Sequence, residues 1–199
     1  MARHYRRKAM GIFELLLRLS FLLGFLIYFH THNLFLSILG FSFIGIIIFT
    51  ISYIRKNITR KKLLNSGMNI VDQMSGEEFE AFLLAHFENL GYKGKLTPIK
   101  NNYGADLIVN KDNFKIVVQA KRWKEKIGVS AIQEVIGAIN YYKASKGMVI
   151  TNSFFTSNAV NLAATSNIEL WDRNKLIDVI NQAQGKNLAE TEVNFPFEE

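Results

Sequence analysis

Residues 104–122, GADLIVNKDNFKIVVQAKR, hold two apolar runs separated by a polar turn. The runs 105–110 and 114–122 have the length of strands, and residues 111–113 have the composition of a turn between them. Residues two apart on a strand point the same way, about 6.6 Å from each other. The pattern therefore predicts two neighbouring strands, with Gln119 and Lys121 on one face of the second.

Upstream of this stretch, the sequence predicts one helix and one further strand. Ser75-Gly76-Glu77-Glu78 fits a capping box, in which Ser75 is the N-cap and Glu78 is the third helical residue. Apolar residues then recur at helical spacing until Gly91, which ends the helix. Residues 92–99 form the further extended run.

Downstream, helices and strands alternate. The expected elements are a helix over 130–144, a strand over 147–151, a helix over 156–166, a strand over 168–171 and a helix over 174–183. Alternation of this kind implies parallel pairing of the strands. We therefore expect an α/β domain whose mixed sheet is covered by helices.

The composition restricts the chemistry of the chain. Its 199 residues include no cysteine, which excludes disulfides, thiolate nucleophiles and cysteine-ligated zinc. The formal charge is +7, but residues 1–62 hold ten of the 24 basic residues and one of the 17 acidic residues. Residues 63–199 therefore carry 14 basic and 16 acidic side chains. The high net charge belongs to the N-terminal segment and is weak evidence for DNA binding.

Two apolar segments predict a transmembrane hairpin. Residues 34–54, LFLSILGFSFIGIIIFTISYI, carry no charge and are long enough, at about 1.5 Å per residue, to cross a hydrocarbon core of roughly 30 Å. A buried core helix is the alternative, but a domain this small has little room for a helix that is apolar on every side. The first segment, about 12–29, contains Glu14 and Arg18. A signal peptide is its alternative, but no small-residue cleavage site precedes the second segment.

The basic residues predict how the hairpin is oriented. Four precede it and five follow it, whereas the connection 30–33 contains neither Lys nor Arg. We therefore expect a multi-pass protein of the cell inner membrane with both termini in the cytoplasm. The run 55–62 is expected to contact anionic lipid headgroups, with nucleic acid as its alternative ligand. The flanking residues are Arg3, Arg6, Arg7 and Lys8 on one side and Arg55, Lys56, Arg60, Lys61 and Lys62 on the other.

Three residues of the quoted stretch form a candidate hydrolytic site. Asp106 starts the first strand, and Gln119 and Lys121 follow on the second. Carboxylate and amide oxygens are ligands that magnesium prefers, and a lysine can orient water and stabilise charge on a phosphate. Each residue alone is weak evidence, because an Asp before a strand is usually a turn residue and Q-x-K is usually a solvated face. Their order, with Glu80 on the preceding helix as a further ligand, favours the site.

Two groups of residues near this site have less specific patterns. Lys121, Arg122, Lys124 and Lys126 surround Trp123 and predict either a phosphate-facing patch or a solvated loop. Tyr141 and Tyr142 are interpreted as core or helix-packing residues rather than as platforms for base stacking.

The stretch 74–180 contains an ordered set of motifs, Ser75-Gly76-Glu77-Glu78-Phe79-Glu80, Leu90-Gly91-Tyr92, Gly104-Ala105-Asp106-Leu107, Val118-Gln119-Ala120-Lys121-Arg122, Gln133-Glu134-Val135, Val149-Ile150-Thr151-Asn152-Ser153-Phe154, Ala159 and Leu162-Ala163. With this set it resembles the Mrr-like catalytic domain, a branch of the PD-(D/E)xK nuclease superfamily. The resemblance implies a restriction-endonuclease-like αβββαβ core, magnesium dependence (with manganese as the alternative) and hydrolysis of phosphodiester bonds. It also implies that Asp106 and Gln119 are metal-site residues, Lys121 the catalytic lysine, Glu80 an auxiliary metal residue and Gln133 a site-facing residue.

The sequence departs from the superfamily pattern at two positions. Gln119 stands where most members have Asp or Glu, although Gln is common in the Mrr-like branch. Asn102 falls about where relatives often have a further acidic residue. Both departures remove negative charge and are expected to weaken metal binding.

The leading functional prediction is a membrane-anchored, metal-dependent endodeoxyribonuclease of the restriction, defence or repair type. Its partners would be DNA, the lipid bilayer, and a second copy of the chain or a separate specificity protein. The alternative is a catalytically weak nuclease-fold module that binds nucleic acid or a membrane partner. The expected segments are a transmembrane hairpin over 1–62, a linker over 63–74, the nuclease domain over 75–183 and a flexible acidic tail over 184–199.

The predicted orientation can be tested with topology reporters fused at residue 32 and at the C-terminus. The two fusions should report opposite sides of the membrane, because one segment of the hairpin separates them. Reporters found on the same side would contradict a hairpin of two spans.

Overall fold

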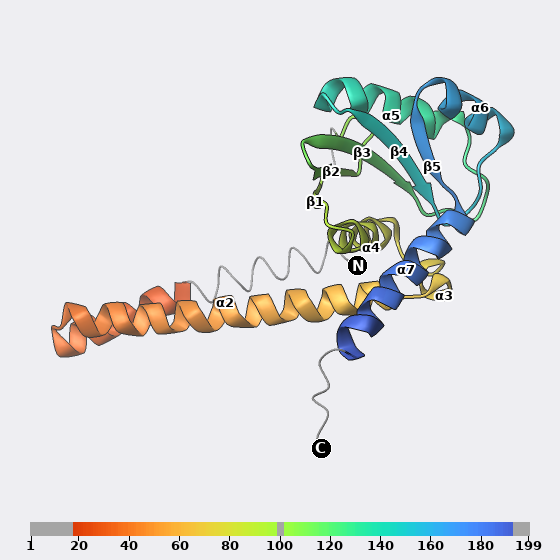
Figure 1. Ribbon diagram of the computed structural model, residues 1–199. Helices are drawn as coiled ribbons and strands as arrows, with labels where there is room; N and C mark the ends of the chain where they lie inside the picture. The colour runs from red at the N-terminus through yellow and green to blue at the C-terminus, as the bar shows by residue number, and fades with distance from the viewer. Residues whose placement is uncertain (1–17, 99–101, 193–199) are drawn as a thin grey trace, which may run out of the picture. The chain divides into compact units, whose positions relative to one another are not determined.

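The computed structural model describes residues 18–98 and 102–192 and divides the chain into two compact units, Met1–Lys61 and Lys62–Glu199. From residue 18 on, the first unit consists of apolar helices, and the second unit is an α/β domain (Figure 1). The expected basic residues 3–8 and the part of the first apolar segment that includes Glu14 lie outside the described residues.

The described part of the first unit is a pair of antiparallel helices, Arg18–Thr31 and α2 (Leu34–Leu64). The Asn33 side chain begins α2, because its Oδ1 accepts a hydrogen bond from Phe35 N at 3.0 Å. The rings of Phe21 and Phe41 lie 4.7 Å apart between the two helices. Among the described residues, α2 alone is long and apolar enough to cross a membrane. It continues past the expected segment 34–54, through the basic run 55–62.

The α/β domain contains the expected mixed sheet, with strand order β1-β2-β3-β4-β5. The strands β1, β2 and β3 are antiparallel neighbours, and β3, β4 and β5 are parallel. A helix precedes β1 and another connects β3 to β4, so the αβββαβ order of the core agrees with the prediction. The strands are β1 (Lys93–Leu96), β2 (Leu107–Lys111), β3 (Phe114–Lys121), β4 (Lys146–Thr151) and β5 (Ile168–Trp171).

Helices cover both faces of the sheet, and a separate apolar core lies on each face (Figure 1). Alternation along the strands divides their side chains, so that Leu107 and Val118 belong to one core and Ile108 and Val117 to the other. The helices α4 (Gly76–Asn89) and α7 (Arg173–Glu192) pack on the first face, and α5 (Val129–Tyr142) and α6 (Ser157–Thr165) pack on the second.

The start of α4 follows the sequence prediction closely. Ser75 Oγ accepts from Glu78 N at 3.2 Å, and Ser75 N donates to Glu78 Oε2 at 2.8 Å, which completes the capping box. The hydrogen bond from the Ser75 backbone is the largest cause that holds the pKa of Glu78 below its ordinary value. Gly91 follows the helix with a φ of +88°, as expected of a residue that ends it.

Two segment boundaries differ from the prediction. The expected linker 63–74 contains a short helix, α3 (Met68–Val71), and buries Leu64, Val71 and Met74. The expected tail from residue 184 is helical as far as Glu192, because α7 continues through Gly185. The tail is polar and carries little apolar periodicity, so its helical state is hard to see in the sequence.

Gly104 fixes the distance between the start of β2 and α5. Its φ is +86°, and a Cβ there would overlap the backbone carbonyl of Glu134. Only glycine combines this conformation with so close an approach. The loop that leads into β2 therefore rests directly on α5.

Substituting Gly104 by Ala should lower the free energy of unfolding by about 2–5 kcal/mol. The added methyl group would strain the backbone at positive φ and would overlap the Glu134 carbonyl, which the helix holds in place. Denaturant unfolding followed by tryptophan fluorescence measures the change. Gly137→Ala is the matched control, because Gly137 is exposed within α5 and a methyl group added there would meet no neighbouring atom within 4 Å. The control should stabilise the domain by about 0.5–1 kcal/mol through helix propensity. Equal effects of the two substitutions would contradict the packing described for Gly104.

Candidate active site

The Asp106 carboxylate is buried at the start of β2, with 9% of the residue exposed. Its Oδ2 accepts hydrogen bonds from Gln119 Nε2 at 2.6 Å and from Ala120 N at 2.9 Å. Its Oδ1 accepts from Asn102 Nδ2 at 3.2 Å. Burial raises the pKa of Asp106, a like-charged Glu134 adds to the rise, and the Ala120 amide and Lys121 oppose it.

Gln119 is buried beside Asp106, and only the nitrogen of its side-chain amide forms a hydrogen bond among the described residues. The Nε2 group donates to Asp106, whereas the buried Oε1 atom has no hydrogen-bond partner in the described part of the chain. Buried acceptors normally have a partner. This oxygen is therefore available to a cation or a water molecule, and it lies next to the carboxylate.

Lys121 extends from the end of β3 on the same face of the sheet as Gln119, since the two are two residues apart. Its Nζ donates to Glu134 Oε2 on α5 at 2.7 Å. Asp106 belongs to this face too, because it alternates with Leu107, whose side chain lies in the core on the opposite face. The structure thus brings Asp106, Gln119 and Lys121 together.

Glu134 is the residue of this group to which the sequence assigned no role. It occurs in the matching stretch 133–135, but an exposed glutamate on a helix is usually a solvated residue. The parallel crossover from β3 through α5 to β4 is what brings it to Lys121. The signal in the sequence that could have indicated Glu134 is a carboxylate on the helix that follows the strand with Lys121.

The other two predicted site residues lie on helices. Glu80 is half-buried on α4, which covers the face of the sheet opposite to Asp106 and Lys121. Gln133 is exposed on α5, beside Glu134. The described residues contain no group of three or more His, Asp or Glu side chains placed to hold a metal ion. The roles of Glu80 and Gln133 stay predictions.

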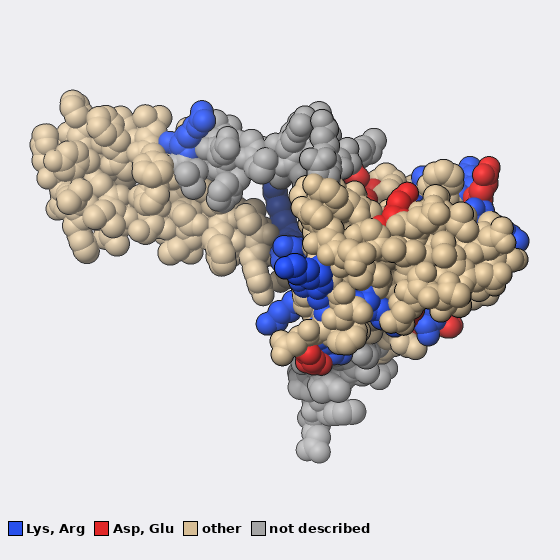
Figure 2. Space-filling view, turned by 90° about the horizontal axis from the view of Figure 1, so that it is seen from above, with Lys and Arg blue, Asp and Glu red and all other residues tan. Residues whose placement is uncertain are grey.

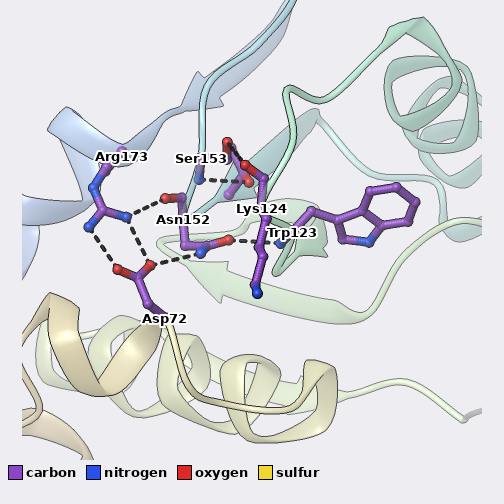
Figure 3. A network of polar contacts seen from close by, with 7 residues as sticks. Asp72, Trp123, Lys124, Asn152, Ser153 and Arg173 are labelled. Carbon is purple, nitrogen blue, oxygen red and sulfur yellow. Dashed lines mark hydrogen bonds and ion pairs between the residues drawn. The ribbon is translucent and has the colours of Figure 1, made fainter.

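A polar network holds the loop that follows Lys121 (Figure 3). Thr151 Oγ1 donates to Lys121 O at 2.7 Å, and Trp123 N donates to Asn152 Oδ1 at 2.8 Å. Asn152 Nδ2 in turn donates to Asp72 Oδ1 at 2.9 Å. The end of β4 therefore sets the path of the chain just after the lysine.

The far end of this network is an ion pair between Asp72 and Arg173. The two guanidinium nitrogens of Arg173 donate to the two oxygens of Asp72 at 2.8 Å each. This contact lowers the pKa of Asp72. The indole of Trp123 points away from the network and is 57% exposed (Figure 3). The sequence did not predict roles for Asp72 or Arg173, which lie far apart along the chain.

The surface charge of the domain is mixed. Seen from above, the domain shows a broad area of uncharged side chains, with basic and acidic groups interspersed along its margins (Figure 2). This agrees with the near-equal numbers of basic and acidic residues in 63–199. DNA binding would therefore depend on local groups near the site rather than on the net charge.

Comparisons with known proteins point to one family. The family model Mrr_cat, restriction endonuclease, matches residues 71–180. The type IV methyl-directed restriction enzyme EcoKMrr of Escherichia coli (strain K12) is 32% identical over an alignment of 117 residues, which covers 54% of this chain and 38% of that enzyme. The match therefore spans well under half of that relative.

Two solved structures resemble the chain. The protein of unknown function AF1548 has a TM-score of 0.47 at 15% identity and matches 53% of this chain and 65% of its own. The DNA modification-dependent restriction endonuclease AspBHI has a TM-score of 0.48 at 17% identity and matches 63% of this chain and 35% of its own.

Replacing Asp106 by Asn should raise the melting temperature of the metal-free protein at neutral pH. Folding raises the pKa of the Asp106 carboxyl, which means that its ionised form is less favourable in the folded chain than in the unfolded chain. The wild type therefore loses stability as the pH rises from the ordinary value of 3.8 through the raised folded pKa. The gain of the variant should be small below this window and largest above it. Thermal unfolding over a pH series in chelator measures it, and a gain that does not change with pH would contradict this assignment.

Proposed function

Because the chain belongs to the Mrr_cat restriction endonuclease family, we propose that its domain 75–183 is a metal-dependent nuclease that hydrolyses phosphodiester bonds of DNA. The observation that carries the proposal is the set of contacts around Asp106. A buried carboxylate, an amide oxygen that has no partner among the described residues and a lysine ammonium converge at the ends of β2 and β3. Oxygen ligands beside a cationic donor suit the binding and cleavage of a phosphate ester.

The donor set fits a hard divalent cation, with Mg²⁺ proposed and Mn²⁺ as the alternative. Asp106 would contribute its carboxylate and Gln119 its Oε1, the buried acceptor that has no partner among the described residues. The auxiliary role predicted for Glu80 is not part of this donor set, because α4 covers the opposite face of the sheet. A cation bound there would polarise a phosphate oxygen and lower the pKa of a bound water.

Lys121 is proposed to stabilise negative charge on the phosphate and to orient the attacking water. An ammonium has three N–H donors, of which one is used on Glu134. The remaining donors can reach a phosphate oxygen or water without breaking that contact. Glu134 thus acts as a positioning residue that holds Lys121 on the face of Asp106, and Gln133 is proposed to face the same site.

The loop after Lys121 is proposed to contact the DNA backbone. Arg122, Lys124 and Lys126 are basic, and Trp123 is exposed between them. The hydrogen bond from Trp123 N to Asn152 keeps this loop in a defined path next to the site. Ordered cations next to the cleaved bond favour binding of phosphates.

The N-terminal unit is proposed to anchor the nuclease domain to the cell inner membrane. Large apolar side chains cover the helix pair on the outside, for example Phe35 at 70% and Phe49 at 73% exposed. Such surfaces are unfavourable in water and favourable in lipid. We propose that both helices span the bilayer and that the domain faces the cytoplasm.

The partner that selects the DNA is a further part of the proposal. The relative named above is methyl-directed, but the match covers 38% of it, so its selectivity stays a property of that enzyme. We propose that a second copy of this chain or a separate specificity protein takes part in choosing and cutting the substrate.

A catalytically weak binding module is the second candidate function. Asp106 has amide side chains, Gln119 and Asn102, as hydrogen-bond donors, where superfamily members often have acidic residues. Neutral neighbours attract a divalent cation less strongly than carboxylates do. This candidate predicts DNA or partner binding without efficient cleavage.

The full chain, purified in detergent, should cleave plasmid DNA with Mg²⁺, and a chelator should abolish the cleavage. Lys121→Ala should lower the rate by two to three orders of magnitude, since charge stabilisation of this kind is worth about 3–4 kcal/mol. Lys175→Ala is the control, because Lys175 is an exposed lysine of α7, which packs on the face of the sheet opposite to Asp106 and Lys121, and it should retain the activity. A Lys121→Ala variant as active as wild type would contradict the assignment of the catalytic lysine.

Gln119→Glu separates the two candidate functions in the same assay. If the wild type is inactive with Mg²⁺ and Mn²⁺ while Gln119→Glu cleaves, the wild-type site lacks only metal affinity and the binding module is favoured. If both cleave, the nuclease proposal stands and the Glu variant should need less metal.

A further inference from the structure

Two tyrosines stack on each other at the surface of the α/β domain. The ring centroids of Tyr103 and Tyr141 are 3.7 Å apart with an interplanar angle of 21°. The two residues are 50% and 55% exposed, respectively. The expectation that Tyr141 is a core or packing residue is therefore wrong, because its ring lies on another exposed ring rather than in the core. Tyr142 does pack, with its hydroxyl 3.2 Å from Asn102 O.

The backbone at Tyr103 is held in an unfavourable conformation. Its φ is +50°, in the left-handed region that a bulky side chain rarely adopts. Half of the residue stays in solvent, so the conformation is not compensated by burial in the core. Strain of this kind collects at functional sites, where the position of a side chain is part of the function.

The stack adjoins the candidate active site. Asn102, the residue before Tyr103, donates to Asp106 Oδ1, and Gly104, the residue after it, abuts the backbone of Glu134. Tyr141 follows Glu134 by seven residues on α5, which is about two turns and roughly 10 Å along the same side of the helix. The rings therefore lie within a few nucleotide steps of Lys121, given a rise of about 3.4 Å per step.

Basic groups accompany the rings. Lys143 is exposed at the end of α5, directly after Tyr142. Lys115 Nζ lies 3.0 Å from Tyr142 O, and Lys121 is at the site itself. Aromatic faces for bases and ammonium groups for phosphates are the combination with which proteins bind single-stranded nucleic acid.

We propose that Tyr103 and Tyr141 form a platform on which an unpaired base of the DNA substrate stacks, next to the strand that Lys121 and Asp106 engage. The inference rests on the proposed nuclease function and deepens it by naming the substrate class. That class is DNA with unpaired bases beside the cleaved bond, as in single strands, flaps and bubbles.

Binding without cleavage tests the platform. The full chain in detergent micelles, with chelator present, is titrated against a fluorescent single-stranded oligonucleotide and against a duplex of the same length. Tyr141→Ala should weaken single-strand binding by about tenfold to a hundredfold, the range expected for the loss of one aromatic stacking contact. Duplex binding should change little, and Tyr141→Phe, which keeps the ring, should behave like the wild type.

Two further variants keep the test sharp. Tyr103→Gly removes the other ring and relieves the positive φ, so a loss of single-strand binding there cannot be attributed to misfolding from backbone strain. Phe114→Ala is the matched control, because Phe114 is 52% exposed and, two residues from Ile116, lies on the face of the sheet opposite to α5. The control should bind both oligonucleotides like the wild type.

The outcomes separate the platform from the nuclease proposal. Single-strand affinity that is absent in the wild type, or unchanged in both Tyr141→Ala and Tyr103→Gly, overturns the platform even if plasmid DNA is cleaved. Equal losses on single strand and duplex overturn it too, in favour of a general backbone contact. A selective loss of single-strand binding supports the platform even if no DNA is cleaved.

Discussion

The buried carboxylate of Asp106 is the group on which the arrangement at the end of the sheet depends. A carboxylate taken out of water needs hydrogen-bond donors, and Ala120 N, Gln119 and Asn102 supply them. These donors come from β3 and from the loop before β2. The contacts that satisfy one charge therefore also hold the ends of the two strands together. Lys121 follows Ala120 directly, so its position is a consequence of the same contacts.

The close approach of the β2 loop to α5 adds a second layer to this arrangement. Gly104 rests on the backbone of Glu134, and the Glu134 side chain pairs with Lys121. Glu134 thus restricts the position of the loop that carries Asn102 and Tyr103, and it also sets the direction of the Lys121 side chain. The stacked rings of Tyr103, in this loop, and Tyr141, on α5, form a second contact between the same loop and the same helix. Site and proposed base platform are parts of one loop-to-helix packing arrangement.

The site combines a raised carboxylate pKa with neutral neighbours. Asn102 and Gln119 avoid the repulsion that additional buried carboxylates would cause, at the cost of weaker attraction for a cation. The Asp72–Arg173 pair acts at a different place, since it holds Asn152 and through it the loop that follows Lys121.

The sequence by itself determined the strands and most of the helices of the α/β domain, and the core of the candidate site. The capping box at Ser75, the turn at 111–113 and strand β5 follow from local patterns, because capping, turn formation and periodicity involve residues close along the chain. Asp106, Gln119 and Lys121 could be grouped because they lie on two neighbouring strands joined by a short turn. Only the tertiary structure decided the partners from elsewhere: Glu134 for Lys121, Tyr141 for Tyr103 and Arg173 for Asp72. Those contacts join distant segments through helix packing, and no local pattern specifies which side chains meet when helices pack on a sheet.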